Sequence, residues 1–483
     1  MKLIGKLLSF PSGIILAMVL GPEDYGLVGV AMLYITYATW INPGIVIAAK
    51  RELPGMVKQE QQVEFKHLAS VSLSFDLLIA FFVTAGLCAF SMTIDESLMR
   101  TLMFIAILGF LVTKLYDYFS AIAYSKLQFK LLTKVKFVER VVAPVLSIVL
   151  VFYFKIYVLV LVPVLVQFIG LLVFIKNIRL DFKPTFNWQE FIRLTKVGIP
   201  LVLMGFLYKA FIGIADKTII VRYLDIVQLG LFLYAYSYVN ILTDLFRDFG
   251  RVLAPVLWRN ASDAADDIAA FGDTFRFSVY FAILSAVIGL VAQMFFILLV
   301  STVTVKFKAA VPIFLILSFG IYFEALQIFP EYILSSKRLN KQNYIIRVWG
   351  FYLALNVILD IALIILGYGI IGVAIATTIT QGGATFTMYF VAHRHFIPEG
   401  KSLAGLIKLL FLPFAVLIAI TLVHAAILIY HVPLLYLLFT IPLQILIWYL
   451  LALGPYQEFD IMRHTRSLIR TICGSLRTRF KIA

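Results

Sequence analysis

Acidic and basic side chains occur inside long apolar stretches of this chain, where a charge is costly and usually has a role. Lys114 and Asp117 lie three residues apart in one stretch, and Lys209 and Asp216 lie seven apart in another. Both spacings return to one face of a helix. Such groups either neutralise each other as pairs that hold helices together, or line a water-filled cavity that binds a charged ligand.

Cations inside apolar stretches are suited to holding an anionic ligand. Lys114 and Lys209 lie close to the middle of their stretches, and Arg140 and Lys217 lie nearer the ends of theirs. The candidate ligand-binding residues are therefore Lys114, Lys209, Arg140 and Lys217. Asp117 and Asp216 are their expected polar partners.

A second set of charged residues consists of acids without an obvious basic partner in the same stretch, namely Asp76, Glu324 and Asp360. Glu324, Gln327 and Glu331 form a polar stripe at helical spacing, which indicates a face directed into a helix bundle. These acids either couple transport to a proton or sodium gradient, or pair with Lys and Arg on other helices. The sequence has no GxxxxGK[ST] loop for nucleotide phosphates, so no cofactor is expected beyond a coupling H⁺ or Na⁺.

Other site classes are not indicated. His393 and His395 flank Arg394 without further metal ligands nearby, so no metal site is predicted. No catalytic residues are predicted either.

The elements that hold these residues follow from composition. Of 483 residues 62% are apolar and 14% are charged, with a mean hydropathy of +0.99, which excludes a soluble globular protein. Each membrane-spanning helix needs about 20 apolar residues. Because the apolar runs are long and continuous, they predict helices and not a barrel. The sequence predicts an all-α polytopic membrane protein with about fourteen spans, placed near 3–20, 26–49, 67–93, 98–124, 136–154, 156–175, 197–221, 228–250, 274–300, 308–334, 344–366, 368–392, 404–429 and 433–454.

The distribution of Lys and Arg predicts the orientation. Most of the 41 basic residues fall in alternate loops, and basic loops stay on the cytoplasmic side. Both termini are therefore expected in the cytoplasm, with the protein in the cytoplasmic (inner) membrane. The net charge of +15 indicates contact with anionic lipid rather than nucleic acid. The first stretch, which follows Lys2 and Lys6, is expected to remain as an uncleaved span, because no small-x-small cleavage site follows it.

The chain also contains an internal repeat. At an offset of 204 the aligned pairs are Leu20 with Leu224, Gly26 with Gly230, Ala31 with Ala235 and Tyr34 with Tyr238. We therefore expect two six-helix lobes and two added helices. The expected divisions are an N-terminal lobe at 1–175, a cytoplasmic linker at 176–196, a C-terminal lobe at 197–392, two further spans at 404–454 and a basic amphipathic cytoplasmic tail at 456–483. Substrate sites of transporters often lie between such repeats.

Several motifs occur in the order and spacing of a known family: LGPEDYG at 20–26, GIP at 198–200, the Asp216–Lys217 pair, Pro255 and GYGIIGVAIAT at 367–377. With these motifs the chain resembles, over its whole length, the polysaccharide (O-antigen and capsule repeat-unit) flippases of the MOP exporter superfamily. One position departs from the pattern, since Met18 stands where members commonly carry a basic residue.

The resemblance implies a transporter that flips a polyprenyl-diphosphate-linked oligosaccharide repeat unit by alternating access, for surface polysaccharide biosynthesis. Its implied partners are the lipid-linked glycan, membrane lipids and a polysaccharide polymerase or assembly machinery, with no nucleic acid. One alternative is a drug or cation antiporter of the same superfamily. Another is a membrane polymerase or glycosyltransferase, which the short predicted outer loops and the missing DxD motif disfavour. We therefore expect a transporter and not an enzyme.

Overall fold

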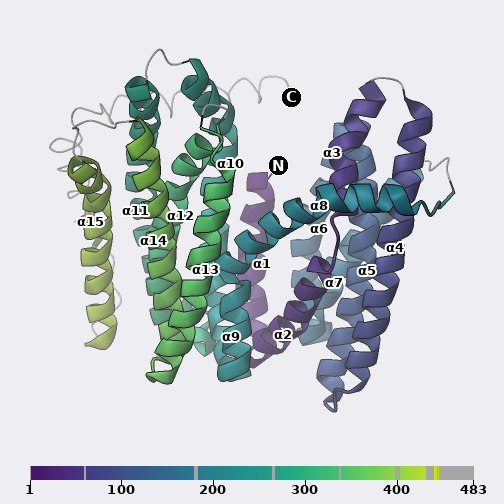
Figure 1. The fold of residues 1–483 in the computed structure, drawn as a ribbon. Helices are drawn as coiled ribbons and strands as arrows, with labels where there is room; N and C mark the ends of the chain where they lie inside the picture. Colours follow the sequence, from purple (N-terminus) through teal and green to yellow (C-terminus); the bar gives the residue numbers. More distant parts are fainter. Residues whose placement is uncertain are drawn as a thin grey trace, which may run out of the picture. The chain divides into compact units, whose positions relative to one another are not determined.

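The computed structural model describes residues 2–58, 61–178, 183–263, 267–336, 339–396, 403–430, 440–442 and 444. Throughout these residues the secondary structure is helical, and they contain no strand (Figure 1). Ten of the described helices are long and apolar enough to cross a membrane, or eleven if the sharply bent α1–α2 pair is one span. The predicted all-α polytopic membrane fold is confirmed. The predicted tail at 456–483 and nearly all of the last span, at 433–454, lie outside the described residues.

The chain divides into two compact units. The first comprises Met1–Ala235, Thr302–Ala310 and Trp349–Ala376, and the second comprises the remaining parts of the chain. The helices up to residue 223 all belong to the first unit: α1 (Lys2–Val19), α2 (Pro22–Trp40), α3 (Ile45–Lys58), α4 (Gln62–Met92), α5 (Ser97–Ser125), α6 (Phe129–Phe154), α7 (Val158–Asn177), α8 (Trp188–Lys209) and α9 (Ala215–Tyr223). The later helices are α10 (Ile226–Asp263), α11 (Asp267–Thr302), α12 (Val311–Leu334), α13 (Gln342–Ile365), α14 (Gly369–Phe396) and α15 (Leu403–Ile429).

The second predicted span, at 26–49, is not one helix. α2 ends at Trp40 and α3 begins at Ile45, with Asn42, Pro43 and Gly44 between them. Pro43 has no N–H to continue a helix, and Gly44 has a φ of 76°, which favours glycine. The Asn42 side-chain oxygen accepts a hydrogen bond from the Gly44 N–H at 2.8 Å, so the break is stabilised locally.

The seventh predicted span, at 197–221, also differs from the structure. α8 begins at Trp188, inside the predicted linker, where the Asn187 side chain accepts a hydrogen bond from the Glu190 N–H at 3.1 Å and caps the helix. In Figure 1 α8 runs across the view while α4, α5 and α7 stand upright. Its first turn packs aromatic rings on α4, with the centroids of Phe191 and Phe75 4.3 Å apart.

A π-helical turn, Ala210–Ile214, separates α8 from α9. A π-turn contains more residues than an α-turn. It therefore rotates the later side chains about the helix axis relative to those before the turn. The prediction that Lys209 and Asp216 share one face is therefore wrong, because it assumed an unbroken α-helix. Gly213, with a φ of 138°, lies inside this turn.

The internal repeat is visible in the helix boundaries. α1 ends at Val19 and α9 at Tyr223, while α2 begins at Pro22 and α10 at Ile226, each pair at the offset found in the sequence. The equivalent helix starts pack on each other. A Cβ atom on Gly26 would lie 2.0 Å from the carbonyl oxygen of Ile226, and one on Gly230 would lie 1.7 Å from that of Pro22. The two halves of the repeat thus cross with backbone against backbone.

The LGPEDYG segment builds the start of α2 and this crossing. Pro22 occupies the first turn, where a missing N–H costs nothing, and the Asp24 carboxylate accepts a hydrogen bond from the Gly21 N–H at 2.8 Å. The Tyr25 ring packs edge-on against Tyr234 and Phe307, with centroids 6.0 and 5.3 Å away. The segment therefore has a structural role at the helix crossing.

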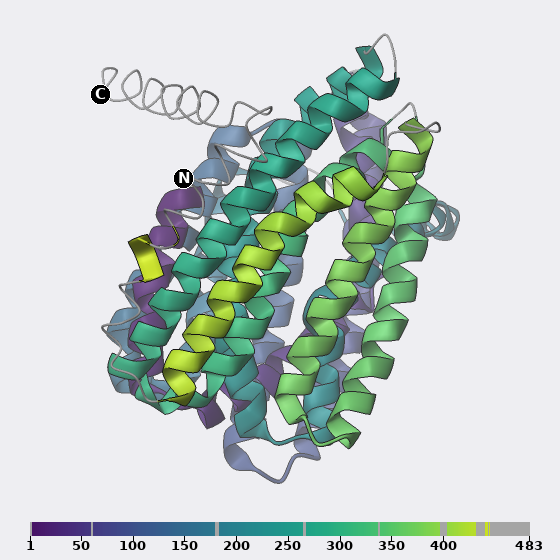
Figure 2. The same cartoon turned by 90° about the vertical axis from the view of Figure 1, so that its left-hand side faces the viewer.

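In the second unit a buried amide joins three helices. Gln293 of α11 donates hydrogen bonds through Nε2 to Ser318 Oγ of α12 at 2.7 Å and to Thr421 Oγ1 of α15 at 2.8 Å. The ring nitrogen Nδ1 of His424 lies 3.0 Å from Gln293 Oε1. Figure 2 shows α15 as a bent rod, and Pro413 lies within it. Polar groups away from water thus satisfy one another and fix α15 to its neighbours.

The glycine crossing predicts opposite effects for two alanine substitutions. In an open helix, Ala is more favourable than Gly by about 1 kcal/mol. Gly230→Ala should nevertheless lower the melting temperature of the detergent-purified protein, because the new methyl group meets the Pro22 carbonyl. Gly86→Ala, at a position with no atom within 4 Å of the added carbon, should leave it unchanged or raise it. Equal melting temperatures for Gly230→Ala and the wild type would refute the crossing.

Candidate functional site

Lys114 and Asp76 form a buried ion pair between α5 and α4. The Lys114 ammonium nitrogen lies 3.6 Å from Asp76 Oδ1, and the two residues are only 6% and 4% exposed. The Phe110 ring, one turn earlier in α5, has its centroid 5.5 Å from the same ammonium. The charge of Lys114 is thus neutralised by an acid on another helix.

Small polar residues line the helix that carries Asp76. Ser70, Ser72 and Ser74 are all buried in α4, and Tyr118 of α5 donates a hydrogen bond to the carbonyl oxygen of Ala69 at 2.8 Å. Because small side chains let helices approach closely, this segment allows α5 to bring Lys114 up to Asp76. The serines of SVSLSFD, residues 70–76, are therefore the sequence feature that permits the Lys114–Asp76 pair.

The partners of Lys114 and Asp117 differ from the simplest sequence interpretation. Asp117 is exposed, and within the described residues the ion pair of Lys114 is made with Asp76. Of the two expected polar partners, Asp117 therefore lies outside the buried pair. Lys114 pairs with Asp76 because α4 and α5 are in contact. Residue spacing along one helix does not reveal such a contact.

A second buried polar group joins α9 and α13. The Asn356 amide nitrogen donates to Asp216 Oδ1 at 3.2 Å and to Asp360 Oδ2 at 2.9 Å, and all three residues are fully buried. Oδ1 of Asp360 has no hydrogen-bond donor among the described residues. Two carboxyl groups therefore lie on either side of one amide nitrogen. Such a pair favours a proton or a small cation, because two neighbouring carboxylates in a dry site repel each other.

The remaining candidate cations lie in three different settings. Lys209 is the last residue of α8 and its side chain is exposed. Lys217 is half-buried and directly follows Asp216 in α9, while Arg140 is half-buried in α6. Of these three cations, Lys217 is the one that is adjacent in sequence to a buried acid, Asp216. Lys209 remains accessible.

Glu324 pairs with Arg247 in the second unit. The Arg247 guanidinium donates to Glu324 Oε2 through NH2 at 2.6 Å and through Nε at 3.1 Å. Further along α12, Gln327 donates to Glu331 Oε1 at 2.7 Å. The predicted polar stripe of α12 is therefore directed into the unit, where Glu324 and Gln327 are buried.

Sequence reasoning missed three residues that complete these groups. Asn356 lies four residues before Asp360, which places an amide and an acid on one face of an apolar helix. This spacing could have predicted their contact. Arg247 lies on α10, and spacing along α12 does not reveal that it contacts Glu324. His424 lies in an apolar stretch close to Thr421, and its partner Gln293 is 131 positions away.

Two solved structures have a fold similar to that of this chain. The structure of the lipid II flippase MurJ in an inward closed conformation has a TM-score of 0.66 and 15% identity, covering 97% of this chain and 98% of that chain. An inward-facing multidrug resistance MATE family transporter of the MOP superfamily has a TM-score of 0.63 and 13% identity, covering 81% and 94%. The chain therefore has the fold of the MOP superfamily transporters.

The sequence itself identifies the family. Residues 15–302, more than half of the chain, match the family described as polysaccharide biosynthesis protein. The chain belongs to this family, as the motifs at 20–26 and 198–200 indicated. The comparison with curated proteins gives no match.

The buried ion pair predicts a clear result from a double-mutant cycle. Lys114→Met or Asp76→Asn alone should lower the free energy of unfolding by about 3–5 kcal/mol, because each leaves an unpaired buried charge. The double variant should recover part of that loss. Thermal unfolding in detergent measures the stability of the wild type, the two single variants and the double variant.

The pair Lys136–Glu139, with a 2.9 Å separation, an exposed lysine and a half-buried glutamate, is the control at a less buried position. Lys136→Met and Glu139→Gln should each change stability by less than about 1 kcal/mol. Single Lys114 and Asp76 variants as stable as the wild type would contradict the pairing.

Proposed function

We propose that this protein is a flippase that moves a polyprenyl-diphosphate-linked oligosaccharide repeat unit across the cytoplasmic membrane for surface polysaccharide biosynthesis. Its two repeat-related lobes, 1–175 and 197–392, alternate access to the two sides. It acts as a transporter and not as an enzyme. Both termini face the cytoplasm, and its partners are the lipid-linked glycan, membrane lipids and a polymerase or assembly machinery.

One observation carries the proposal. A chain of the polysaccharide biosynthesis protein family shares its fold, over 97% of its length, with a lipid II flippase. Lipid II is a lipid-linked cargo, and polysaccharide synthesis supplies cargo of the same kind. The match to the multidrug transporter covers 81% of the chain, so the flippase accounts for more of it.

The basic residues suit a diphosphate cargo. Lys209 is exposed at the end of α8 and is suited to the first contact with the anion, with Lys217 and Arg140 as further candidates. Lys114 is neutralised by Asp76 at 3.6 Å and joins only when the two side chains separate. A cargo with more than one negative charge needs more than one cation, so separation of this pair would supply a second one.

The acids suit coupling to an ion gradient. Asp76 and Glu324 each have a basic partner, whereas Asp360 shares Asn356 with another acid, Asp216. We assign the coupling cation, a proton or Na⁺, to Asp360 and Asp216. Cation binding there fixes α9 to α13, and Lys217 beside Asp216 senses the change in charge.

Binding of the cargo distinguishes the flippase from a drug or cation antiporter. Lys209→Met should weaken binding of a polyprenyl-diphosphate oligosaccharide to the purified protein by about tenfold to a hundredfold, because it removes a charge-assisted contact of about 1.5–3 kcal/mol. Binding of a lipophilic cationic dye should be unchanged or improved. Native mass spectrometry measures both.

Lys196→Met is the control, since Lys196 is an exposed lysine of the same helix. Dye binding that exceeds glycolipid binding, together with glycolipid binding that Lys209→Met leaves unchanged, would favour the antiporter over the flippase.

The coupling site predicts a cation effect on stability. The melting temperature of the wild type should rise when NaCl replaces choline chloride, or should depend on pH if the cation is a proton. Asp360→Asn should remove this response, because it removes one of the two facing carboxyl groups. Asp117→Asn, at an exposed acid, should keep it. If wild type and Asp360→Asn respond alike to Na⁺ and to pH, Asp360 has no part in coupling.

A further inference from the structure

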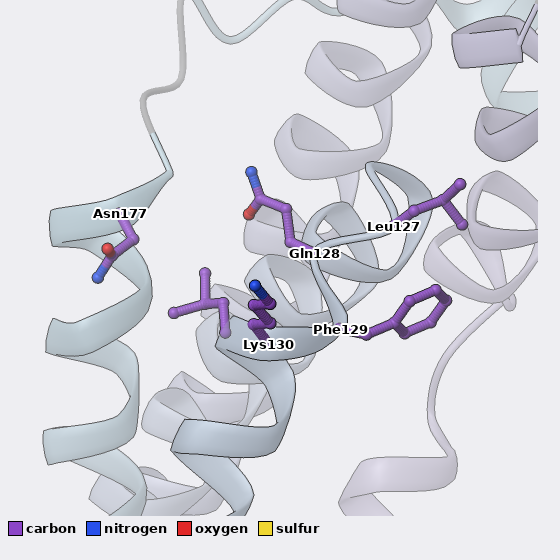
Figure 3. A pocket seen from close by; sticks show the side chains of 6 residues that line it. Leu127, Gln128, Phe129, Lys130 and Asn177 are labelled. Atoms are coloured by element: carbon purple, nitrogen blue, oxygen red, sulfur yellow. The ribbon is translucent and has the colours of Figure 1, made fainter.

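A hollow of about 580 Å³ lies in the first unit, where the turn between α5 and α6 faces the end of α7. Its lining residues are Leu127, Gln128, Phe129, Lys130, Leu131 and Asn177. Figure 3 shows Gln128 and Lys130 turned toward the side of Asn177, while Leu127 and Phe129 point the other way. The polar groups therefore gather on one side of the turn.

The charge of the hollow is positive. Lys130 is exposed and has no ion-pair partner among the described residues, and the same holds for Lys134, one helical turn further along α6. The neighbouring Lys136 differs, since it pairs with Glu139 at 2.9 Å. Lys130 is the cation in the lining of the hollow, and Lys134, on the same face of α6, adds positive charge nearby, so the hollow favours an anion such as a phosphate.

The side chain of Gln128 points to a second feature of the ligand. Its oxygen Oε1 is buried and has no hydrogen-bond donor within the described residues. Asn177 does not supply one, because its amide nitrogen donates to the carbonyl oxygen of Val173 at 2.7 Å. A buried acceptor without a donor is unsatisfied, and a ligand donor reaches it when the Gln128 side chain turns toward the hollow that it lines. A hydroxyl group close to the phosphate meets this need.

The surroundings of the hollow suit a molecule with acyl chains. Exposed apolar side chains follow one stripe of α7 toward Asn177, at Leu165, Phe168, Ile169, Leu172 and Ile175. On the turn itself Leu127 and Phe129 are 61% and 52% exposed. In a membrane-spanning protein such surfaces contact hydrocarbon, and the hollow lies where the stripe ends. A soluble phosphate would make no use of this stripe.

We propose that this hollow binds an anionic phospholipid with a glycerol headgroup, of the phosphatidylglycerol type. The phosphate contacts Lys130, a headgroup hydroxyl donates to Gln128 Oε1, and the acyl chains lie along α7. Basic pockets between spanning helices on the cytoplasmic side are known to bind such headgroups, and the Lys and Arg distribution puts this turn on that side. The site is independent of the proposed cargo, since it takes a bilayer lipid.

The test measures lipid binding to the full-length protein in detergent by native mass spectrometry. Phosphatidylglycerol should bind in preference to phosphatidylcholine. Lys130→Gln should weaken phosphatidylglycerol binding about fivefold, the equivalent of about 1 kcal/mol for one lysine near a lipid surface. Gln128→Leu should reduce the preference for phosphatidylglycerol over phosphatidic acid, which lacks the headgroup hydroxyls.

Lys66→Gln is the matched control, because Lys66 is an exposed lysine on the same predicted side, at the start of α4, and does not line the hollow. It should bind phosphatidylglycerol as the wild type does. Equal binding of the two lipids, or an unchanged affinity in Lys130→Gln, would overturn the proposal. Competition by millimolar glycerol phosphate alone would show a soluble anion site and would overturn it as well.

Discussion

The structure depends on the cost of placing a polar group in hydrocarbon, where no water is available to solvate it. Several of the buried polar side chains considered above therefore have a partner on another helix. Lys114 meets Asp76, Arg247 meets Glu324, and Gln293 binds two hydroxyl groups at once. These contacts hold helices together.

Close backbone approach is the second means of joining helices. Gly26 and Gly230 occupy equivalent positions of the repeat, and each faces a backbone carbonyl at the start of the other's helix. Without a hydrophobic driving force between helices in lipid, such close packing is what brings them together.

The fold class and the repeat were predictable because they depend on composition and on periodic pattern. The break at Pro43 and the π-turn before Asp216 were not predicted, although Pro43 and Gly44 mark the first and Gly213 marks the second. The pairing of Lys114 with Asp76 depends on which helices touch, and one sequence does not contain that information. Asn356 joins the two acids, but a neutral amide in an apolar stretch is a weaker sequence signal than a charged residue.

Transport by the purified protein tests the account most directly. Vesicles would carry a fluorescent polyprenyl-diphosphate oligosaccharide in both leaflets, and a quencher that does not cross the bilayer would be added outside. Our account predicts that the label protected in protein-free vesicles becomes accessible when the folded protein is present. If that label stays protected in vesicles that contain the folded protein under an imposed proton or Na⁺ gradient, the protein is not a flippase for this cargo.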